Sequence, residues 1–149
     1  MSKKFKYKFD TLLRLRKILK DLQESKLARA TQAHKEVEDK INKLNDKQHQ
    51  TYEEMIDNLG DTFSLIDQQN QEAFNYMIIG ERSKEAVRLA KREKARKVEH
   101  ERFIEYAIAH KALEKLRDKA YELAQKELLA EEMKQIDDLV ISRHRVQDK

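Results

Sequence analysis

The amino-acid sequence predicts an all-α protein, a long antiparallel two-helix coiled coil that forms one hairpin. Ala, Glu, Leu, Lys and Arg make up about half of the 149 residues, a composition typical of long helices. Two glycines and no proline cannot supply the turns of a many-stranded β protein or a Gly-rich phosphate loop. Apolar residues recur in steps of three and four on both sides of one strong turn signal.

The first helix is expected over about residues 10–58. Its apolar and small residues lie on one stripe, which Lys26 and Gln48 interrupt, and this side would be buried against the second helix. The stripe comprises Leu12, Leu15, Leu19, Leu22, Ala30, Ala33, Val37, Ile41, Leu44, Tyr52, Met55 and Leu59.

The turn is expected at about residues 59–63. Asn58 and Gly60 suit the end of a helix, because both residue types tolerate the left-handed conformation found there. The candidates for the N-cap of the second helix are Asp61, Thr62 and Ser64.

The second helix is expected over about residues 64–142. Gly80 has no companion turn residues, so we interpret it as a kink within one helix; a break that leaves a short helix up to Ile79 is the alternative. A heptad pattern follows at Tyr106, Ala109, Leu113, Leu116, Ala120 and Leu123, and it drifts to Ala130, Met133, Ile136 and Val140.

The two ends of the chain carry opposite charges. Residues 1–20 hold eight Lys or Arg and one Asp, and residues 121–138 hold six acids and two Lys. An antiparallel hairpin brings these segments together, and their attraction helps to set the register. Phe5, Tyr7 and Phe9 alternate with lysines. We expect these aromatic side chains to pack on the second helix, with partner binding as the alternative.

No candidate site for catalysis, a cofactor or a metal emerges from the sequence. There is no cysteine, and two helices offer no cleft that would shift the pKa of a carboxylate. The pair His100-Glu101 lacks the second histidine of a zinc-protease motif, because Ile104 occupies that position. No apolar run approaches the length of a membrane span or the core of a signal peptide, so we expect a cytosolic chain.

Two segments of the second helix are candidates for interaction. The basic run at residues 88–97 is typical of a solvated coiled-coil face; binding of nucleic acid or acidic lipid through Lys91, Arg92 and Arg96 is the alternative. Near the turn, apolar residues cover nearly all sides of the helix, so at least one must face outward. They are Phe74, Tyr76, Met77, Ile78 and Ile79.

Both ends of the chain resemble the flagellar export family FliJ. Its members open with alternating aromatic residues followed by a Leu-Leu-x-x-Arg motif, and their C-terminal half carries Ala-Leu-Glu-Lys-Leu before an acidic segment. The matching residues at the start are Phe5, Tyr7, Phe9, Leu12, Leu13, Arg14 and Arg16. Those in the second half are Ala112, Leu113, Glu114, Lys115, Leu116, Glu131, Glu132, Asp137 and Leu139, with Asp138 where many members have Glu.

The resemblance implies a non-enzymatic stalk of the flagellar type III export apparatus, similar to the central stalk of rotary ATPases. The end with both termini would insert into the export ATPase hexamer and promote its assembly and ATP hydrolysis. The turn end would face the export gate in the membrane, and export chaperones would also bind. No cofactor and no nucleic acid are implied. The protein would lie at the cytoplasmic face of the membrane near the basal body, held there only by its partners.

The resemblance also assigns candidate partner-binding residues. Near the termini the candidates are Phe5, Tyr7, Phe9, Arg14, Arg16, Lys17, Asp137 and Asp138. Of these, Arg14, Arg16 and Lys17 would meet acidic loops of the ATPase pore. Phe74 and Ile78 fall where the family carries an apolar strip for the gate, and Glu81 and Glu85 continue that face. Alternative functions are the stalk of a virulence type III system or rotary ATPase, or a basic helix that binds nucleic acid. A lone hairpin and a four-helix dimer bury similar stripes, so both oligomeric states remain open.

Overall fold

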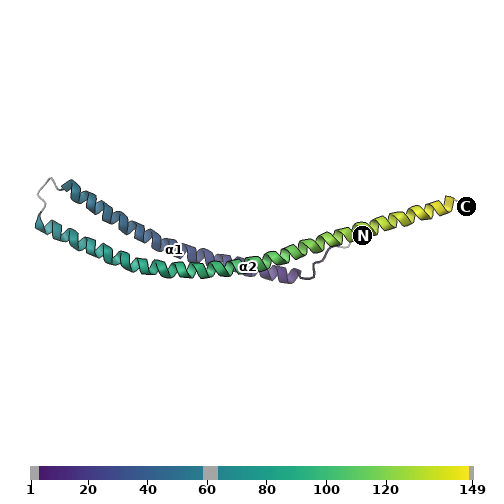
Figure 1. The fold of residues 1–149 in the computed structure, drawn as a ribbon, viewed down its shortest axis with the longest axis horizontal. Helices are drawn as coiled ribbons and strands as arrows, with labels where there is room; N and C mark the ends of the chain where they lie inside the picture. The colour runs from purple at the N-terminus through teal and green to yellow at the C-terminus, as the bar shows by residue number, and fades with distance from the viewer. Residues whose placement is uncertain (1–3, 59–63, 148–149) are drawn as a thin grey trace. The chain divides into compact units, whose positions relative to one another are not determined.

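The computed structural model describes residues 4–58 and 64–147, and all regular structure within them is α-helical. Helix α1 spans Asp10–Asn58 and helix α2 spans Leu65–Gln147 (Figure 1). The two pack antiparallel as a coiled-coil hairpin, which confirms the predicted fold class. The expected turn with Gly60, and the capping candidates Asp61 and Thr62, lie outside the described residues.

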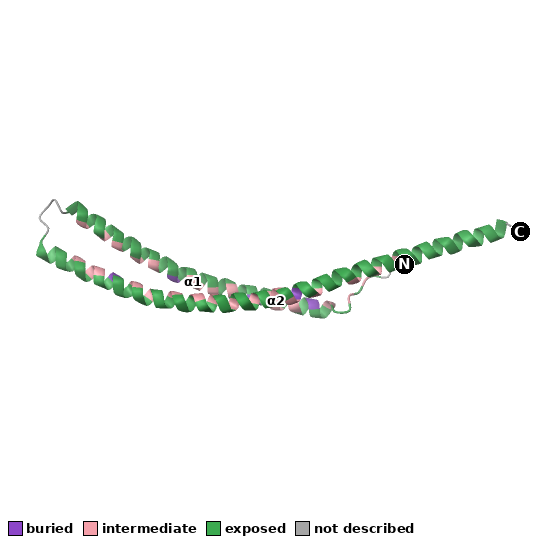
Figure 2. Ribbon diagram, viewed as in Figure 1, coloured by how far each residue is buried: buried purple, intermediate pink, exposed green. Residues whose placement is uncertain are grey.

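The paired helices form two compact units. The terminal unit contains Met1–Asp21 and Glu105–Lys149, and the hairpin unit contains Leu22–Ile104. Each unit therefore takes one segment from α1 and one from α2. The facing sides of the paired segments carry the buried and half-buried residues, and the outer sides are exposed (Figure 2).

Helix α2 begins with a reciprocal cap between Ser64 and Asp67. The backbone N–H of Asp67 donates to Ser64 Oγ at 3.2 Å, and the backbone N–H of Ser64 donates to Asp67 Oδ2 at 3.1 Å. Ser64 Oγ also donates to Asp67 Oδ2 at 2.8 Å, and these hydrogen bonds from Ser64 lower the pKa of Asp67. Two otherwise unpaired N–H groups are satisfied in this way, so the helix start is specified by local sequence.

The stripe of α1 that faces α2 follows an unbroken alternation of three and four residues. Val37, Ile41 and Leu44 lie on it, as expected, but Leu12, Leu15, Leu22 and Tyr52 are exposed, and the prediction was wrong for these four. A regular helix carries the phase set by its best apolar contacts along its whole length, whatever residue types fall in line. The observed stripe is Leu13, Arg16, Lys20, Gln23, Leu27, Ala30, His34, Val37, Ile41, Leu44, Gln48, Thr51 and Met55.

The facing stripe of α2 in the hairpin unit is largely polar. Hydrogen bonds between the helices replace part of the apolar packing: Arg82 donates to Asn45 Oδ1 at 2.8 Å and to Gln48 Oε1 at 3.0 Å. Gln23 is 4% exposed and donates to the carbonyl oxygen of Glu99 at 3.1 Å. The stripe is Gln71, Asn75, Ile78, Arg82, Glu85, Leu89, Glu93, Arg96, Glu99 and Phe103.

In the terminal unit, the predicted heptad of α2 is only partly correct. Tyr106, Ala109, Leu113 and Ala120 are half-buried, but Leu116 and Leu123 are exposed and His110 is buried among the packed residues. His110 Nε2 lies 3.7 Å from Glu114 Oε1 one turn further along the helix. The physical cause is the same as in α1. The side of the helix that contacts its partner continues with a regular period, whereas the positions of the apolar residues in the sequence depart from that period.

Helix α2 continues through Gly80, so the alternative of a break at this residue is wrong. Gly80 has no positive φ, and an added Cβ would meet nothing within 4 Å. Its lack of a side chain therefore serves neither a turn nor a close helix contact.

Ile78 is the best-buried side chain of the hairpin unit, and its truncation tests the packing. Ile78 is 1% exposed, whereas its neighbour Ile79 is 48% exposed. Ile78→Ala should lower the free energy of unfolding by about 2–4 kcal/mol, because it removes buried methyl groups and leaves a cavity. The matched change Ile79→Ala should alter it by less than about 0.5 kcal/mol. Urea unfolding followed by circular dichroism measures both; equal effects would show that Ile78 is not a core residue.

Candidate partner-binding surfaces

The aromatic side chains before α1 pack mainly on α2 within the terminal unit. The rings of Phe5 and Tyr121 meet edge to face, with centroids 5.3 Å apart. The hydroxyl of Tyr7 donates to the carbonyl oxygen of Leu113 at 3.5 Å, while Phe9 is 45% exposed. Packing on the second helix is therefore what the structure shows for Phe5 and Tyr7, and Phe9 offers the more open surface.

The three basic residues assigned to a partner differ in exposure. Arg14 is exposed and forms a 3.0 Å ion pair with Asp10 in the first turn of α1. Lys17 is also exposed, but Arg16 is half-buried on the stripe that faces α2. A long side chain can pack its aliphatic part against a neighbouring helix while its charge stays in water. Arg14 and Lys17 are thus more exposed to solvent than Arg16.

An exposed apolar stripe lies beside these cations on α1. The spacing in the sequence instead places its residues Leu12 and Leu15 on the buried side of the helix. Leu12, Leu15 and Ile18 lie outside the helix contact on α1, and Leu116 and Leu123 do so on α2 of the same unit. Each residue follows apolar spacing that is out of phase with the stripe in contact. The signal was present in the sequence as two competing phases, Leu12–Leu15–Leu19 and Leu13–Arg16–Lys20.

The last described part of α2 is exposed to solvent. Every described residue from 129 to 147 is exposed, including Asp137 and Asp138 (Figure 2). Leu129, Met133 and Ile136 form an open apolar stripe there. Among the described residues of the terminal unit, no ion pair joins the basic N-terminal segment to the acidic segment at residues 121–138. Both Asp137 and Asp138 are therefore available to a partner.

Phe74 and Ile78 do not form an open apolar patch in the hairpin unit. Ile78 is buried and Phe74 is half-buried, because both lie on the side of α2 that faces α1. The outward residues of this segment are Tyr76, Met77 and Ile79, with Tyr76 the most exposed. The patch assigned to Phe74 and Ile78 is corrected accordingly: the open apolar surface belongs to their neighbours.

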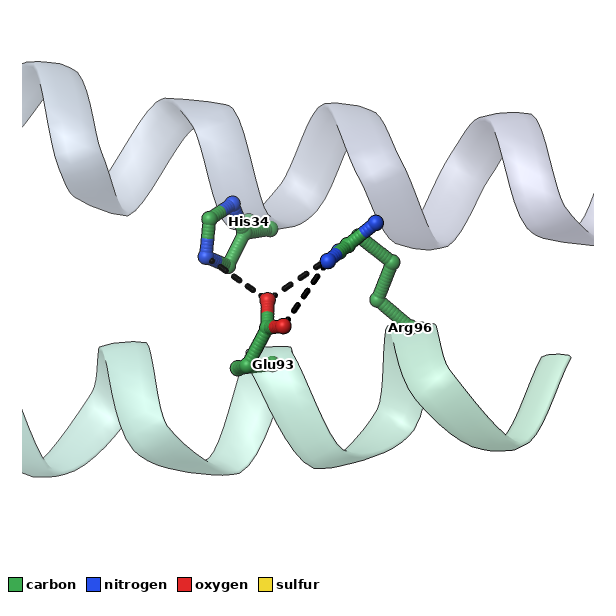
Figure 3. Close-up of polar contacts among 3 residues, drawn as sticks. All are labelled: His34, Glu93 and Arg96. Carbon is green, nitrogen blue, oxygen red and sulfur yellow. Dashed lines mark hydrogen bonds and ion pairs between the residues drawn. The ribbon is translucent and has the colours of Figure 1, made fainter. Parts of the chain in front are cut away.

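A polar cluster joins the helices in the middle of the hairpin unit (Figure 3). His34 Nε2 on α1 lies 3.1 Å from Glu93 Oε2 on α2, and Arg96 contacts the same carboxylate at 2.8 and 3.0 Å. The hydrogen bonds from Arg96 lower the pKa of Glu93, and the same contact raises the pKa of Arg96. The cluster holds one carboxylate between an imidazole of α1 and a guanidinium of α2, and its contact with His34 joins the two helices.

The described residues carry neither a cluster of metal-binding side chains nor a membrane-spanning helix. Residues 4–58 and 64–147 contain no group of three or more His, Asp or Glu side chains placed to hold a metal ion. No helix within them is both long and apolar enough to cross a membrane. The surfaces that the described residues present are apolar stripes and charged faces on paired helices, as in coiled-coil proteins.

Comparison with known families gives this class a name. The family model described as Flagellar FliJ protein matches residues 5–149, nearly the whole chain. The chain therefore belongs to the FliJ family and has a role related to flagellar type III protein export. This confirms the resemblance inferred from the two ends. Searches of curated proteins and of solved structures gave no match.

The contact between the helices at Glu93 predicts a pH dependence. Because the folded pKa of Glu93 is lowered, its carboxylate stabilises the fold above its unfolded pKa, and this contribution disappears as the pH falls through the lower folded value. Glu93→Gln should therefore lower the melting temperature at neutral pH, and the difference from the unmodified chain should shrink in acid. The exposed Glu101→Gln is the control. A constant difference from neutral to strongly acidic pH would contradict the role of the ionised carboxylate.

Proposed function

We propose that this chain is a non-enzymatic stalk and adaptor of the flagellar export apparatus, which binds the export ATPase hexamer and promotes its assembly and ATP hydrolysis. The single observation that supports it most is the exposed apolar stripe of the terminal unit, Leu12, Leu15 and Ile18 beside Arg14 and Lys17. The hairpin does not use this stripe, and exposed apolar surface rimmed by polar residues marks a protein contact. The family match supplies the export setting.

The terminal unit offers two kinds of contact to such a ring. The exposed segment from 129 to 147 presents apolar residues and the carboxylates Asp137 and Asp138, and the start of α1 presents cations beside leucines. A protein ring that surrounds a helix pair can use both: apolar contacts supply affinity, and charges set orientation and the rate of association. Phe9, which is partly exposed, extends the same surface.

The hairpin unit is proposed to contact the export gate. Tyr76, Met77 and Ile79 provide the exposed apolar surface, and half-buried Phe74 lies beside them. Export chaperones are further proposed partners. Through these contacts the chain would be held at the cytoplasmic face of the membrane near the flagellar basal body.

The first test measures ATP turnover by the purified export ATPase with and without this chain. The unmodified chain should raise turnover, and the double variant Leu12→Ser/Leu15→Ser should lose most of this stimulation, because two exposed apolar contacts contribute about 1–2 kcal/mol each when buried. Val87→Ser/Ile104→Ser, which changes exposed apolar residues of the hairpin unit, is the matched control. If the unmodified chain neither stimulates the ATPase nor binds it on gel filtration, the proposal fails.

The second test separates the gate surface from the core. Tyr76→Ser/Ile79→Ser should weaken binding to the purified cytoplasmic domain of the gate protein at least about tenfold and leave ATPase stimulation intact, since both side chains are exposed. Circular dichroism should show unchanged helix content. Full gate binding by this variant would remove the proposed surface.

A further inference from the structure

The hairpin unit carries a groove between α1 and α2 with basic side chains on both walls. Two neighbouring hollows of about 440 and 510 Å³ share Lys40 and Arg88, so they form one continuous groove. The apolar residues that line the groove are Leu44, Val37, Ala33 and Ala95. The exposed basic residues of the two walls are Lys40, Lys43 and Lys47 on α1 and Lys84, Arg88, Lys91 and Arg92 on α2; we call this the basic groove.

The basic groove is a second region of excess positive charge, besides residues 1–20. Seven cations line it against three carboxylates, Glu36, Glu81 and Glu85. The resulting balance of four positive charges equals the formal net charge of the whole chain, so all other residues together are neutral. Only the contact between Arg88 and Glu85, at 3.1 Å, joins opposite charges as an ion pair among the described lining residues. Most of the lysines therefore have no internal partner.

The walls have the geometry of a site for a third helix. Each wall holds a row of three cations in steps of three and four residues, which spans about 10 Å at 1.5 Å per residue. The rows are Lys40, Lys43 and Lys47, and Lys84, Arg88 and Lys91. A helix packs into the groove between two others at an axial distance of about 8–10 Å. Carboxylates spaced i, i+3 or i+4, and i+7 on its two flanks would then lie opposite both rows, with small apolar side chains over the floor.

The chemistry of the groove favours a protein helix over phosphate groups. Glu36, Glu81 and Glu85 lie among the cations, and they repel a nucleic-acid backbone or a lipid phosphate, which offers acceptors only. A helix can present donors to these carboxylates as well as acids to the lysines. No aromatic side chain lines the described hollows, so a stacking platform for bases is absent from them.

We propose that the basic groove binds an acidic amphipathic helix of a partner protein. The helix lies along the groove, its small apolar residues over Leu44 and Ala95 and its acids against the lysine rows. This site is separate from the apolar surfaces of the proposed function, and its test requires neither the ATPase nor the gate.

The test uses the full chain and a fluorescent synthetic peptide about three heptads long, with Ala and Leu on one stripe and Glu on both flanks. Fluorescence anisotropy should show binding that weakens as salt rises. Lys40→Glu/Lys43→Glu/Lys84→Glu should weaken it at least about tenfold, since several rim charges are reversed together. The matched variant Lys26→Glu/Lys35→Glu/Lys94→Glu makes the same charge change on exposed residues of the same unit and should change affinity less than about twofold.

Three further measurements decide the proposal. A peptide with Lys in place of Glu should bind the groove-reversed variant and not the unmodified chain, and this rescue also shows that the variant is folded. A peptide of the same composition in scrambled order should not bind the unmodified chain. Equal losses in both triple variants, or equal or tighter binding of a DNA duplex or of phosphatidylglycerol vesicles, would overturn the assignment of a helical protein partner.

Discussion

The contact stripe between α1 and α2 is the constraint on which the other features depend. Val37, Ile41 and Leu44 are consecutive apolar residues of this stripe on α1, and regular helix geometry extends its phase in both directions. Residues that fall in line are drawn into the contact even when they are polar, as Gln23 and Arg16 are. Residues one position away are left outside even when they are leucines. The phase of the contact stripe thus decides both which residues of α1 are buried and which are exposed.

The polar stripe of α2 helps to fix the register between α1 and α2 in the hairpin unit, although little apolar surface is buried there. The contact of His34 with Glu93, and the hydrogen bonds from Arg82 to two side chains of α1, join the helices and are lost if one helix shifts along the other. Such contacts add little net stability at partly exposed sites, but they penalise other alignments. The buried oxygens of Gln71, Asn75 and Glu85 without a hydrogen-bond partner show that this part of the stripe is incompletely satisfied. We infer that packing at Ile78 carries much of the stability here.

Apolar residues that the hairpin leaves exposed form the surfaces proposed for partners. Leu12 and Leu15 in the terminal unit, and Tyr76 and Ile79 in the hairpin unit, are open to binding because the contact stripe passes beside them. The cations of the basic groove are outside the stripe for the same reason. A coiled coil with one narrow stripe keeps most of its surface for such contacts, in agreement with an adaptor role in export.

The sequence by itself determined the helical fold, the absence of strands from the described chain, a helix cap among Asp61, Thr62 and Ser64, and the family. These follow from composition, local hydrogen bonding and motifs that need no tertiary information. The tertiary structure decided which of two competing heptad phases of α1 is buried. It also decided that on α2 Ile78 is buried and Tyr76 is exposed. Steps of three and four are satisfied equally well by the two phases of α1, Leu12–Leu15–Leu19 and Leu13–Arg16–Lys20, and only the match to a facing helix distinguishes them. The groove was likewise decided by tertiary structure, because its two walls lie about forty residues apart in the sequence.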